Sequence, residues 1–482
     1  MHHLLRQLST FWGILFLCLA PTSNCLPTAA NTGPAASITL PLSRNNEAKP
    51  RQLNGHVHGA VVLQQHVNHA IRRLALMTGG AQPTDYELLW NLHQRISSLP
   101  TSAQNQYPLD GITVALTDHF AVHSSNLTSI SFVNAIQSFG RGPEEGRMAT
   151  SMPLHTLGLD IESTDIGYIA TVQVGTPPRD YRLLVDSGSA DLWVGAQGCV
   201  GDDGGSCGNH TFLGDRTSTS YVDANETWAV AYVSGDVAGN IVRDNVHIAG
   251  LTLKGHTFGV ATNESSDFTG NDIPFDGILG LGKYDLSQQR VPTLMQALHT
   301  SKLIKEPIVS YKLPRLADGK RNTGEMTLGA MDPKHYDSQT LVLVPNVNKF
   351  GFWGANVSTV HVGKHNMGWS RTVVMDTGTD VDAIHKRIPS AVYQGGSWTV
   401  PCNMTTIISL TISGQEFDIN PADIAFWPLE EGSSQCMSGI AVGGVGPFYL
   451  ATEWLVGDVF LKNVYFSTNE ASDTISIAKP VH

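Results

Sequence analysis

The feature that most constrains this chain is a pattern that occurs twice, once in each half of its body. Residues 183–189 read LLVDSGS, and residues 373–379 read VVMDTGT. In each copy the aspartate is followed by an apolar-apolar-Gly segment, 92 residues later in the first half and 79 residues later in the second. This spacing predicts two related lobes of about 160 residues each.

Short apolar runs alternate with turn residues from residue 157 onward. Residues 169–174 precede the turn sequence GTPP at 175–178, and residues 181–185 precede the first motif aspartate. Runs of this length, bounded by Gly, Pro, Asn and Asp, are typical of β-strands. Helical patterns are few, and residues 291–299 form the clearest one. We therefore predict an all-β fold, for which the hydrophobic content of 41% supplies large cores.

Residues 26–150 differ from the body of the chain. Residues 63–77 and 88–96 have helix-compatible apolar spacing, whereas residues 97–150 are rich in Ser, Thr, Asn, Gly and Pro. We expect the latter to be a flexible connector.

Charge is distributed unevenly along the chain. Nine Lys and Arg and seven Asp and Glu precede residue 151, against 21 and 35 from there on. A basic front before an acidic body predicts a pro-segment that associates electrostatically with the rest, although chance composition would give the same difference. The net charge of −12 argues against a nucleic-acid partner.

The N-terminus has the pattern of a secretory signal. Arg6 supplies positive charge, and residues 11–20 form an apolar run too short to span a bilayer. Small and polar residues follow, so we place the signal peptide at residues 1–25. Residues 475–480 do not form the hydrophobic tail of a lipid anchor. We expect a soluble, secreted monomer without a membrane anchor, and a vacuolar destination stays open.

Four cysteines remain if Cys18 and Cys25 leave with the signal peptide. An even number in a secreted chain predicts disulfides. A zinc site is the alternative, but no C-x-x-C motif or matching histidine spacing supports it. Pairing of neighbours in sequence gives Cys199–Cys207 and Cys402–Cys436.

Six N-x-S/T sequons predict glycosylation at some surface positions. The candidates are Asn126, Asn209, Asn225, Asn263, Asn356 and Asn403.

The repeated Asp motif is the strongest candidate for a reactive site. One Asp-Ser-Gly is ordinarily a β-turn. Two copies, one per half, each after an apolar strand and before a second hydroxyl residue, point to a function instead. The strand would place each Asp at the edge of a core, the hydroxyl would orient it, and the glycine would allow close backbone approach.

Residues 157–482 resemble the pepsin-like aspartic endopeptidases, in particular secreted fungal acid proteases. The resemblance implies a bilobal all-β fold with two pseudo-two-fold related lobes, an active-site cleft between them, and Asp186 and Asp376 as the catalytic pair. It also fits the two cysteine pairs to usual disulfides of the family. The similar segments are residues 186–194 (DSGSADLWV), 232–239 (YVSGDVAG), 275–282 (FDGILGLG), 376–379 (DTGT) and 455–460 (LVGDVF).

Paired carboxylates suit peptide hydrolysis. Two like charges a few ångströms apart share one proton, because ionising both is costly. The ionised partner can activate a water that attacks a peptide carbonyl, while the protonated partner donates to the developing oxyanion. Asp186 and Asp376 act as one unit, so we do not assign base and acid between them. We expect hydrolysis of protein and peptide substrates at acidic pH, with no metal and no cofactor.

The resemblance also implies supporting residues around the pair. Ser187 and Thr377 would form hydrogen bonds behind the pair, across the lobes, and Ser189 and Thr379 would bond the outer carboxylate oxygens. Ser187 replaces the family's commoner Thr and keeps the hydroxyl. The motif glycines are Gly188 and Gly378.

A flap over the substrate is the third implied feature. Tyr232, Ser234 and Gly235 would belong to it, and Trp193 would hold the Tyr232 hydroxyl. The alternatives are that Trp193 is only a core residue and that Tyr232 is only a strand aromatic. Val233 lies where the flap often has Gly, and its β-branch is expected to stiffen the hairpin.

Residues 38–44 and the stretch up to Arg72 and Arg73 resemble the family's inhibitory pro-segment, although its dyad-blocking Lys is not identifiable. We hypothesise that protonation near pH 6 helps to release this segment, and the histidines concerned are His56, His58, His66 and His69. Asp380, which follows the second motif, either faces solvent or favours basic substrates.

The whole pattern predicts a zymogen with four parts: a signal peptide at 1–25, a pro-segment with its connector at 26–150, and catalytic lobes at 151–335 and 336–482. Two other classes compete with the protease. One is a catalytically silent pepsin-like binding or inhibitor protein, and the other is a carboxylate-pair glycosidase, which the duplicated Asp motif and the flap disfavour.

Overall fold

The structure is a computed structural model of the 482-residue chain. It describes residues 38–41, seven helical positions between 61 and 75, residues 83–99, 101–104 and 157–162, and most of 167–481. Within the last range, the description leaves out 203, 233–234, 271–272, 316–317, 319–323, 375–380, 395–396, 430–431 and 442–452. All the described residues belong to one compact unit, Ser37–His482.

The first half of the body forms an eight-stranded sheet in the order β2-β3-β4-β9-β5-β8-β7-β6, and β3 also pairs with β7. The predicted strands at 169–174 and 181–185 lie within β3 and β4, which confirms them. The members are β2 (Leu157–Glu162), β3 (Gly167–Val174), β4 (Arg179–Asp186), β5 (Leu192–Gly201), β6 (Val222–Ala231), β7 (Asp236–Ile248), β8 (Leu251–Glu264) and β9 (Gly277–Gly280).

The second half of the body contributes two smaller sheets. One has the order β19-β18-β13-β15-β22, with β14 paired to β13, and the other has the order β16-β17-β21-β20. The members are β13 (Gly354–Val362), β14 (His365–Asn366), β15 (Arg371–Val374), β16 (Val392–Gln394), β17 (Ser397–Pro401), β18 (Ile408–Ile412), β19 (Gln415–Ile419), β20 (Ala425–Pro428), β21 (Gln435–Ser438) and β22 (Glu453–Leu455).

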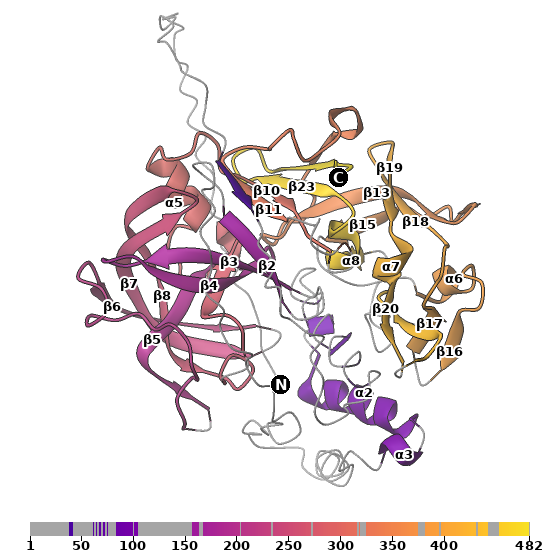
Figure 1. Ribbon diagram of the computed structural model, residues 1–482, viewed down its shortest axis with the longest axis horizontal. Coiled ribbons are helices and arrows are strands. Elements are labelled where there is room, and N and C mark those ends of the chain that lie inside the picture. The colour runs from indigo at the N-terminus through magenta and orange to yellow at the C-terminus, as the bar shows by residue number, and fades with distance from the viewer. Residues whose placement is uncertain are drawn as a thin grey trace, which may run out of the picture. The chain divides into compact units, whose positions relative to one another are not determined.

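A six-stranded sheet joins three distant parts of the chain, in the order β1-β11-β10-β23-β24-β12. In Figure 1 the indigo strand β1, from the N-terminal region, lies beside β11 and β10, and the yellow C-terminal strand β23 follows. The members are β1 (Ile38–Pro41), β10 (Ile308–Lys312), β11 (Glu325–Leu328), β12 (Val342–Pro345), β23 (Tyr465–Asn469) and β24 (Thr474–Ala478).

Helices are few and short, as expected. The predicted helix at 88–96 is confirmed but starts earlier, because Thr84 and Glu87 form a capping box. The one predicted at 291–299 begins only after Thr293, which forms another capping box with Gln296. The helices are α2 (Asp85–Ser97), α3 (Thr101–Gln104), α5 (Leu294–Thr300), α6 (Val381–His385), α7 (Pro421–Ile424) and α8 (Asp458–Leu461), with 3₁₀ turns η2 (Tyr284–Leu286) and η4 (Ser338–Thr340).

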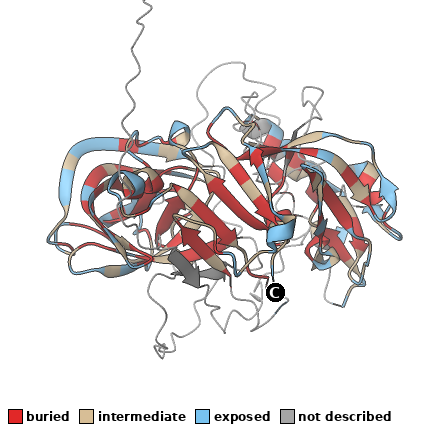
Figure 2. Cartoon of the chain, turned by 90° about the horizontal axis from the view of Figure 1, so that it is seen from above, coloured by how far each residue is buried: buried red, intermediate tan, exposed pale blue. Residues whose placement is uncertain are grey.

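Burial follows the strands. In Figure 2 the buried residues lie mainly along the arrows, and exposed residues gather in the connections. The largest fully buried side chains include Trp193, Tyr181, Tyr465, Phe258 and Phe417, which come from both halves. No helix in the described part of the chain is long and apolar enough to cross a membrane.

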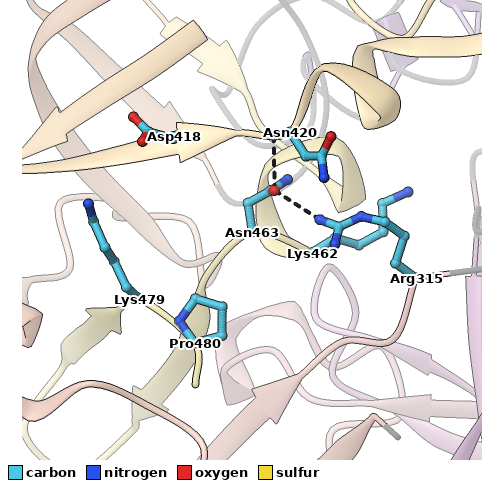
Figure 3. A pocket seen from close by; sticks show the side chains of 7 residues that line it. All are labelled: Arg315, Asp418, Asn420, Lys462, Asn463, Lys479 and Pro480. Atoms are coloured by element: carbon cyan, nitrogen blue, oxygen red, sulfur yellow. Dashed lines mark hydrogen bonds between the residues drawn. The ribbon is translucent and has the colours of Figure 1, made fainter. Parts of the chain in front are cut away.

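A buried ionic cluster ties the two halves together. Arg315, which follows β10, donates to both carboxylate oxygens of Asp423 in α7, at 2.7–3.1 Å. Arg315 Nη2 also donates to Asn463 Oδ1 at 2.9 Å, beside the pocket in Figure 3. Lys462 Nζ lies 3.4 Å from Asp423 Oδ1. The paired charges and the amide satisfy one another, so this cluster can remain buried.

Candidate active site

Asp186 is the last residue of β4, in the interior of the eight-stranded sheet. It lies opposite Gly280 of the parallel strand β9, and its carbonyl accepts a hydrogen bond from Leu281 N at 2.8 Å. The side chain is half-buried, and Gly188 N donates to Asp186 Oδ1 at 2.9 Å. The apolar strand therefore carries the carboxylate to the margin of the core and the turn behind it orients one oxygen.

Gly280 is required by the close approach of the chain below the Asp turn. A Cβ at Gly280 would lie 2.4 Å from the backbone nitrogen of Asp191. The returning segment is further pinned because Gly282 N donates to the carbonyl of Ser189 at 2.6 Å. This explains the glycine in the apolar-apolar-Gly segment that follows the first motif.

Asp191 fixes the end of the loop that runs from Asp186 to β5. The sequence pattern did not reveal this role. Its buried carboxylate accepts bonds from Ser287 Oγ at 2.6 Å and from Gln288 N at 2.8 Å. Burial raises the pKa of Asp191, while these hydrogen bonds lower it. The partner Ser287 lies 96 residues away in sequence, so no local signal identifies the pair.

Trp193 and Tyr232 make the contact that the resemblance implies. Trp193 Nε1 donates to Tyr232 Oη at 2.8 Å. Trp193 is also a core residue, 1% exposed, whose ring packs edge-on against Phe268 at 5.7 Å. The two interpretations of Trp193 are therefore compatible. Burial, with Asp191 and Asp186 nearby, raises the pKa of Tyr232 well above its usual value, so the hydroxyl stays protonated.

Tyr232 begins the turn between β6 and β7. Ala231 pairs with Asp236, and Tyr232 N donates to the carbonyl of Gly235 at 2.7 Å. Ser234 and Val233 lie outside the described residues. Phe268 contacts the Tyr232 ring edge-on at 5.6 Å, so the base of the hairpin rests on an aromatic cluster.

The first motif has two hydroxyl residues, Ser187 and Ser189, and the structure describes both. Ser187 and Gly188 form the turn after Asp186. Ser189 Oγ is buried and forms no hydrogen bond of standard geometry with Asp186 or another described residue, but it lies close enough to Tyr232 to lower the pKa of that hydroxyl. The Oη of Tyr311, which sequence reasoning missed, is also buried without a hydrogen-bond partner in the described part of the chain. Burial raises the pKa of Tyr311, and the nearby Asp186 adds to this shift.

The second motif lies outside the described residues: Asp376, Thr377, Gly378, Thr379 and Asp380. The strand that leads to it is described. β15 ends at Val374, opposite Leu455 of the parallel strand β22. In the first half, Leu184 of β4 lies opposite Ile278 of the parallel strand β9. The two halves thus repeat the same strand pairing, as the duplicated sequence predicts.

Both expected disulfides are present. Cys199 bonds to Cys207, and Cys402 bonds to Cys436. In the described part of the chain, two groups of His, Cys, Asp and Glu have ligand atoms close enough to share a metal ion, and neither includes Asp186.

The family model described as eukaryotic aspartyl protease matches residues 167–480. The chain therefore belongs to the eukaryotic aspartyl protease family, and its all-β, two-lobed fold is the pepsin-like one.

Similar proteins carry matching names. The probable aspartic-type endopeptidase CTSD of Arthroderma benhamiae is 33% identical over 346 residues, which are 67% of this chain and 65% of that protein. Rhizopuspepsin of Rhizopus chinensis is 31% identical over 341 residues, 68% of this chain and 81% of that protein. Cathepsin E of Rattus norvegicus is 28% identical over 333 residues, with 67% and 82% covered. The match thus spans 65% of the length of the Arthroderma relative.

Proposed function

We propose that this protein is an aspartic endopeptidase, made as a zymogen, that hydrolyses peptide bonds in proteins at acidic pH with a water activated between Asp186 and Asp376. The repeated strand pairing carries this proposal. In the first half, Leu184, two residues before Asp186, lies opposite Ile278, two residues before Gly280. In the second half, Val374 lies opposite Leu455 in the same positions relative to Asp376 and Gly457. Equal registers favour equal placement of the two carboxylates.

The chemistry follows from two carboxylates that share one proton. In the acidic range the pair holds one negative charge, because a second would face the first across a few ångströms. The ionised member removes a proton from water, and the protonated member donates to the carbonyl oxygen as it gains charge. Ser187 and Thr377 would brace the pair from behind. Thr379 would bond the outer oxygen of Asp376.

Tyr232 would close the active site from the flap. The bond from Trp193 fixes its hydroxyl, and the raised pKa keeps that hydroxyl a proton donor. Ser234 and Gly235 would then present backbone groups to a substrate in extended conformation. An extended peptide is the class of ligand that a hairpin of this kind binds through main-chain hydrogen bonds.

The zymogen part of the proposal is supported by contacts between the first 104 residues and the body. β1 pairs with β11 from Ile38 opposite Leu328 to Pro41 opposite Glu325. A buried helical face further along contacts β21, where Val67 and Ile71 pack around Met437. These contacts fit a pro-segment that covers the catalytic body until it is removed.

Arg72 connects the same helical face to the base of the flap. It lies near enough to Asp267 to lower the pKa of that carboxyl. A Cβ at Gly235 of the flap turn would lie 3.1 Å from the Asp267 Cβ. We propose that Arg72 helps to hold the pro-segment against this hairpin. The histidine hypothesis for release stays a prediction, because His56, His58, His66 and His69 lie outside the described residues.

Secretion is the proposed route, with the signal peptide at 1–25, the pro-segment at 26–150, and the lobes at 151–335 and 336–482. The two disulfides suit an oxidising compartment. The described sequon asparagines are exposed: Asn209, Asn225, Asn263, Asn356 and Asn403. The final destination is the medium or a vacuole.

The deciding experiment is proteolysis by the acid-treated protein. A denatured globular protein is incubated with it between about pH 3 and 5, with and without a pepstatin-type inhibitor. We expect inhibitor-sensitive cleavage that falls by about 10³-fold or more in Asp186→Asn and in Asp376→Asn. Asp223→Asn, at an exposed position on β6, is the control and should retain full activity. Cleavage undiminished in either motif variant would refute the proposal, and its absence in the parent protein would favour the silent binding fold.

A further inference from the structure

Tyr311 of β10 lies inside the six-stranded sheet, where β10 runs between β11 and β23 (Figure 1). Met326 of β11 and Phe466 of β23 lie opposite it. Both are buried, and the ring of Phe466 stacks on that of Tyr311 with the centroids 5.7 Å apart. Val309 lies two residues before Tyr311, on the same face, and is also buried. Tyr311 therefore carries a hydroxyl group into apolar surroundings.

The titratable groups next to Tyr311 on these strands lie on the other face of the sheet. Lys312 of β10 lies opposite Glu325 of β11 and opposite Tyr465 of β23. All three are one position away from Tyr311 and its partners, and successive side chains of a strand point to opposite faces. The sheet itself therefore places no charge beside the Tyr311 hydroxyl on that face.

The face that carries Tyr311 packs toward the strand that ends at Asp186. Tyr311 belongs to the main hydrophobic core, and Val185, next to Asp186, packs against the same core. The two sheets also meet just beyond β10, where Tyr168 Oη of β3 donates to the carbonyl of Pro314 at 3.2 Å. Asp186 is the charged group that acts on Tyr311 across this core.

The hydroxyl of Tyr311 is not held by another group in the described part of the chain. Its Oη is buried and has no hydrogen-bond partner there. Burial raises the pKa of Tyr311, and Asp186 adds to this shift, so the hydroxyl keeps its proton throughout the acidic range. A hydroxyl dipole that no acceptor fixes can turn in the field of a nearby charge.

We propose that Tyr311 stabilises the ionised state of the Asp186–Asp376 pair from the core side and so keeps the pair active at lower pH. This inference rests on the proposed function. The positive end of an O–H dipole favours the charged form of a carboxyl over its protonated form. Apolar surroundings weaken such an interaction less than water does. The proton that would inactivate the pair therefore binds only at lower pH. Tyr311 acts through the pair and not on the substrate.

Tyr311→Phe tests this inference, because it removes the hydroxyl and keeps the ring that stacks on Phe466. The protein is first activated at one acidic pH, and kcat/KM for a peptide substrate is then measured between about pH 2 and 6. We expect the acid limb of the profile to move up by about 0.3 to 1 pH unit, which is a loss of about two- to tenfold on that limb. On the plateau kcat/KM should change by less than about twofold.

Tyr465→Phe is the matched control from the opposite face of the same sheet. Tyr465 is also buried, but its Oη accepts a hydrogen bond from Asp332 N at 2.8 Å. This variant should lose stability and keep the acid limb of the parent. If it does not fold, Tyr336→Phe replaces it, at a ring that stacks on Tyr465 with the centroids 5.0 Å apart. The thermal midpoint of each variant is measured at every pH, so that unfolding is not mistaken for titration.

An acid limb that moves in Tyr311→Phe and not in the control, in protein that stays folded, supports the inference. The inference is overturned if the limb of Tyr311→Phe coincides with that of the parent, if the control moves as far, or if the shift follows the loss of folded protein. A parent without inhibitor-sensitive cleavage would reject the proposed function and this inference with it. An active parent with an unmoved limb in Tyr311→Phe rejects the inference alone.

Discussion

Trp193 belongs both to the core and to the candidate active site. Its ring packs in the core, whereas its indole nitrogen makes the contact with Tyr232. Trp193→Phe keeps most of the ring packing against Phe268 but removes the hydrogen bond to Tyr232 Oη. A bond of this kind contributes about 1 kcal/mol, so we expect kcat/KM for a peptide substrate to fall roughly fivefold.

Tyr232→Phe should cost a similar amount, and the double variant should cost no more than either single one, because one bond is lost in all three. Steady-state kinetics at acidic pH provide the measurement. Strictly additive losses would contradict the shared bond.

Glu264 is a buried acid whose titration links stability to pH. Burial, with Asp276 nearby, raises the pKa of Glu264 from 4.5 to about 8. Between these two values the folded protein holds a proton that the unfolded chain has released, so stability falls as pH rises through this window. The loss should reach about 5 kcal/mol above pH 8. Glu264→Gln should abolish this dependence, as measured by urea unfolding at several pH values.

The control for Glu264 is Glu226→Gln on the exposed face of β6. It should unfold with the same pH dependence as the parent. If Glu264→Gln lost stability with rising pH as steeply as the parent does, another group would be responsible.

At the scale of elements, the helical face at residues 61–75 packs on β21, and Arg72 of the same segment lies near Asp267, beside the flap turn. Desolvation, with Asp202 and Asp236 nearby, raises the pKa of Asp267 to about 6, whereas Arg72 lowers it. Asp267 is therefore ionised above this pH and attracts Arg72, and it loses its charge as the pH falls.

Arg72→Gln and Asp267→Asn should each let the zymogen convert at a higher pH. Because Asp267 is exposed and Arg72 is half-buried, water screens their attraction, and we expect the midpoint of autoactivation to rise by about 0.2 to 0.7 pH unit. Conversion is followed by gel electrophoresis after incubation at a series of pH values, and Asp223→Asn is the control. If the midpoint falls, or if it also moves in the control, the attraction between Arg72 and Asp267 does not hold the pro-segment in place.

The four histidines make a separate prediction in the same assay. Changing His56, His58, His66 and His69 together to Gln should shift the midpoint if their protonation helps release. An unchanged midpoint would reject that hypothesis without affecting the one for Asp267, because the two sets of groups are independent.

At the scale of the whole molecule, two ion pairs among the described residues join the halves and differ in burial. Arg315 and Asp423 are 7% and 3% exposed, whereas the Asp473 side chain that contacts Lys283 is 47% exposed. Arg315→Ala leaves Asp423 buried without its main partner and should lower the free energy of unfolding by about 3 to 5 kcal/mol. Lys283→Ala should cost less than about 1 kcal/mol. Denaturant unfolding of the zymogen measures both, and equal costs would contradict the difference in burial.

Much of this architecture was predictable from the sequence, because the duplication is local and repeated. The strands that lead to the two motifs, the glycine opposite Asp186 and both cysteine pairs follow from short patterns. The six-stranded sheet that contains β1, β10 and β23 could not be predicted in this way. Its strands come from the beginning, middle and end of the chain, and no local pattern encodes pairing at such distances. The Asp191–Ser287 bond was missed for the same reason.

The candidate site was predictable to a similar extent. The Trp193–Tyr232 contact matches the expectation, whereas the Ser189 bond to the carboxylate does not form among the described residues. Ser189 Oγ is instead buried beside Tyr232, where its orientation depends on packing between β5 and the hairpin. A motif specifies which residue types are present but does not specify such packing.

Strand β1 occupies the edge of the six-stranded sheet, where it pairs with the backbone of β11. If the first part of the chain is removed on activation, β11 is left with a row of unpaired N–H and C=O groups. Such an open edge templates further strands, including those of other copies, and so promotes aggregation. β2 lies against both β1 and β11, and it is the segment at hand to fill the vacated place. On activation, strand exchange within one molecule therefore competes with strand pairing between molecules. A high concentration of newly activated protein favours pairing between molecules.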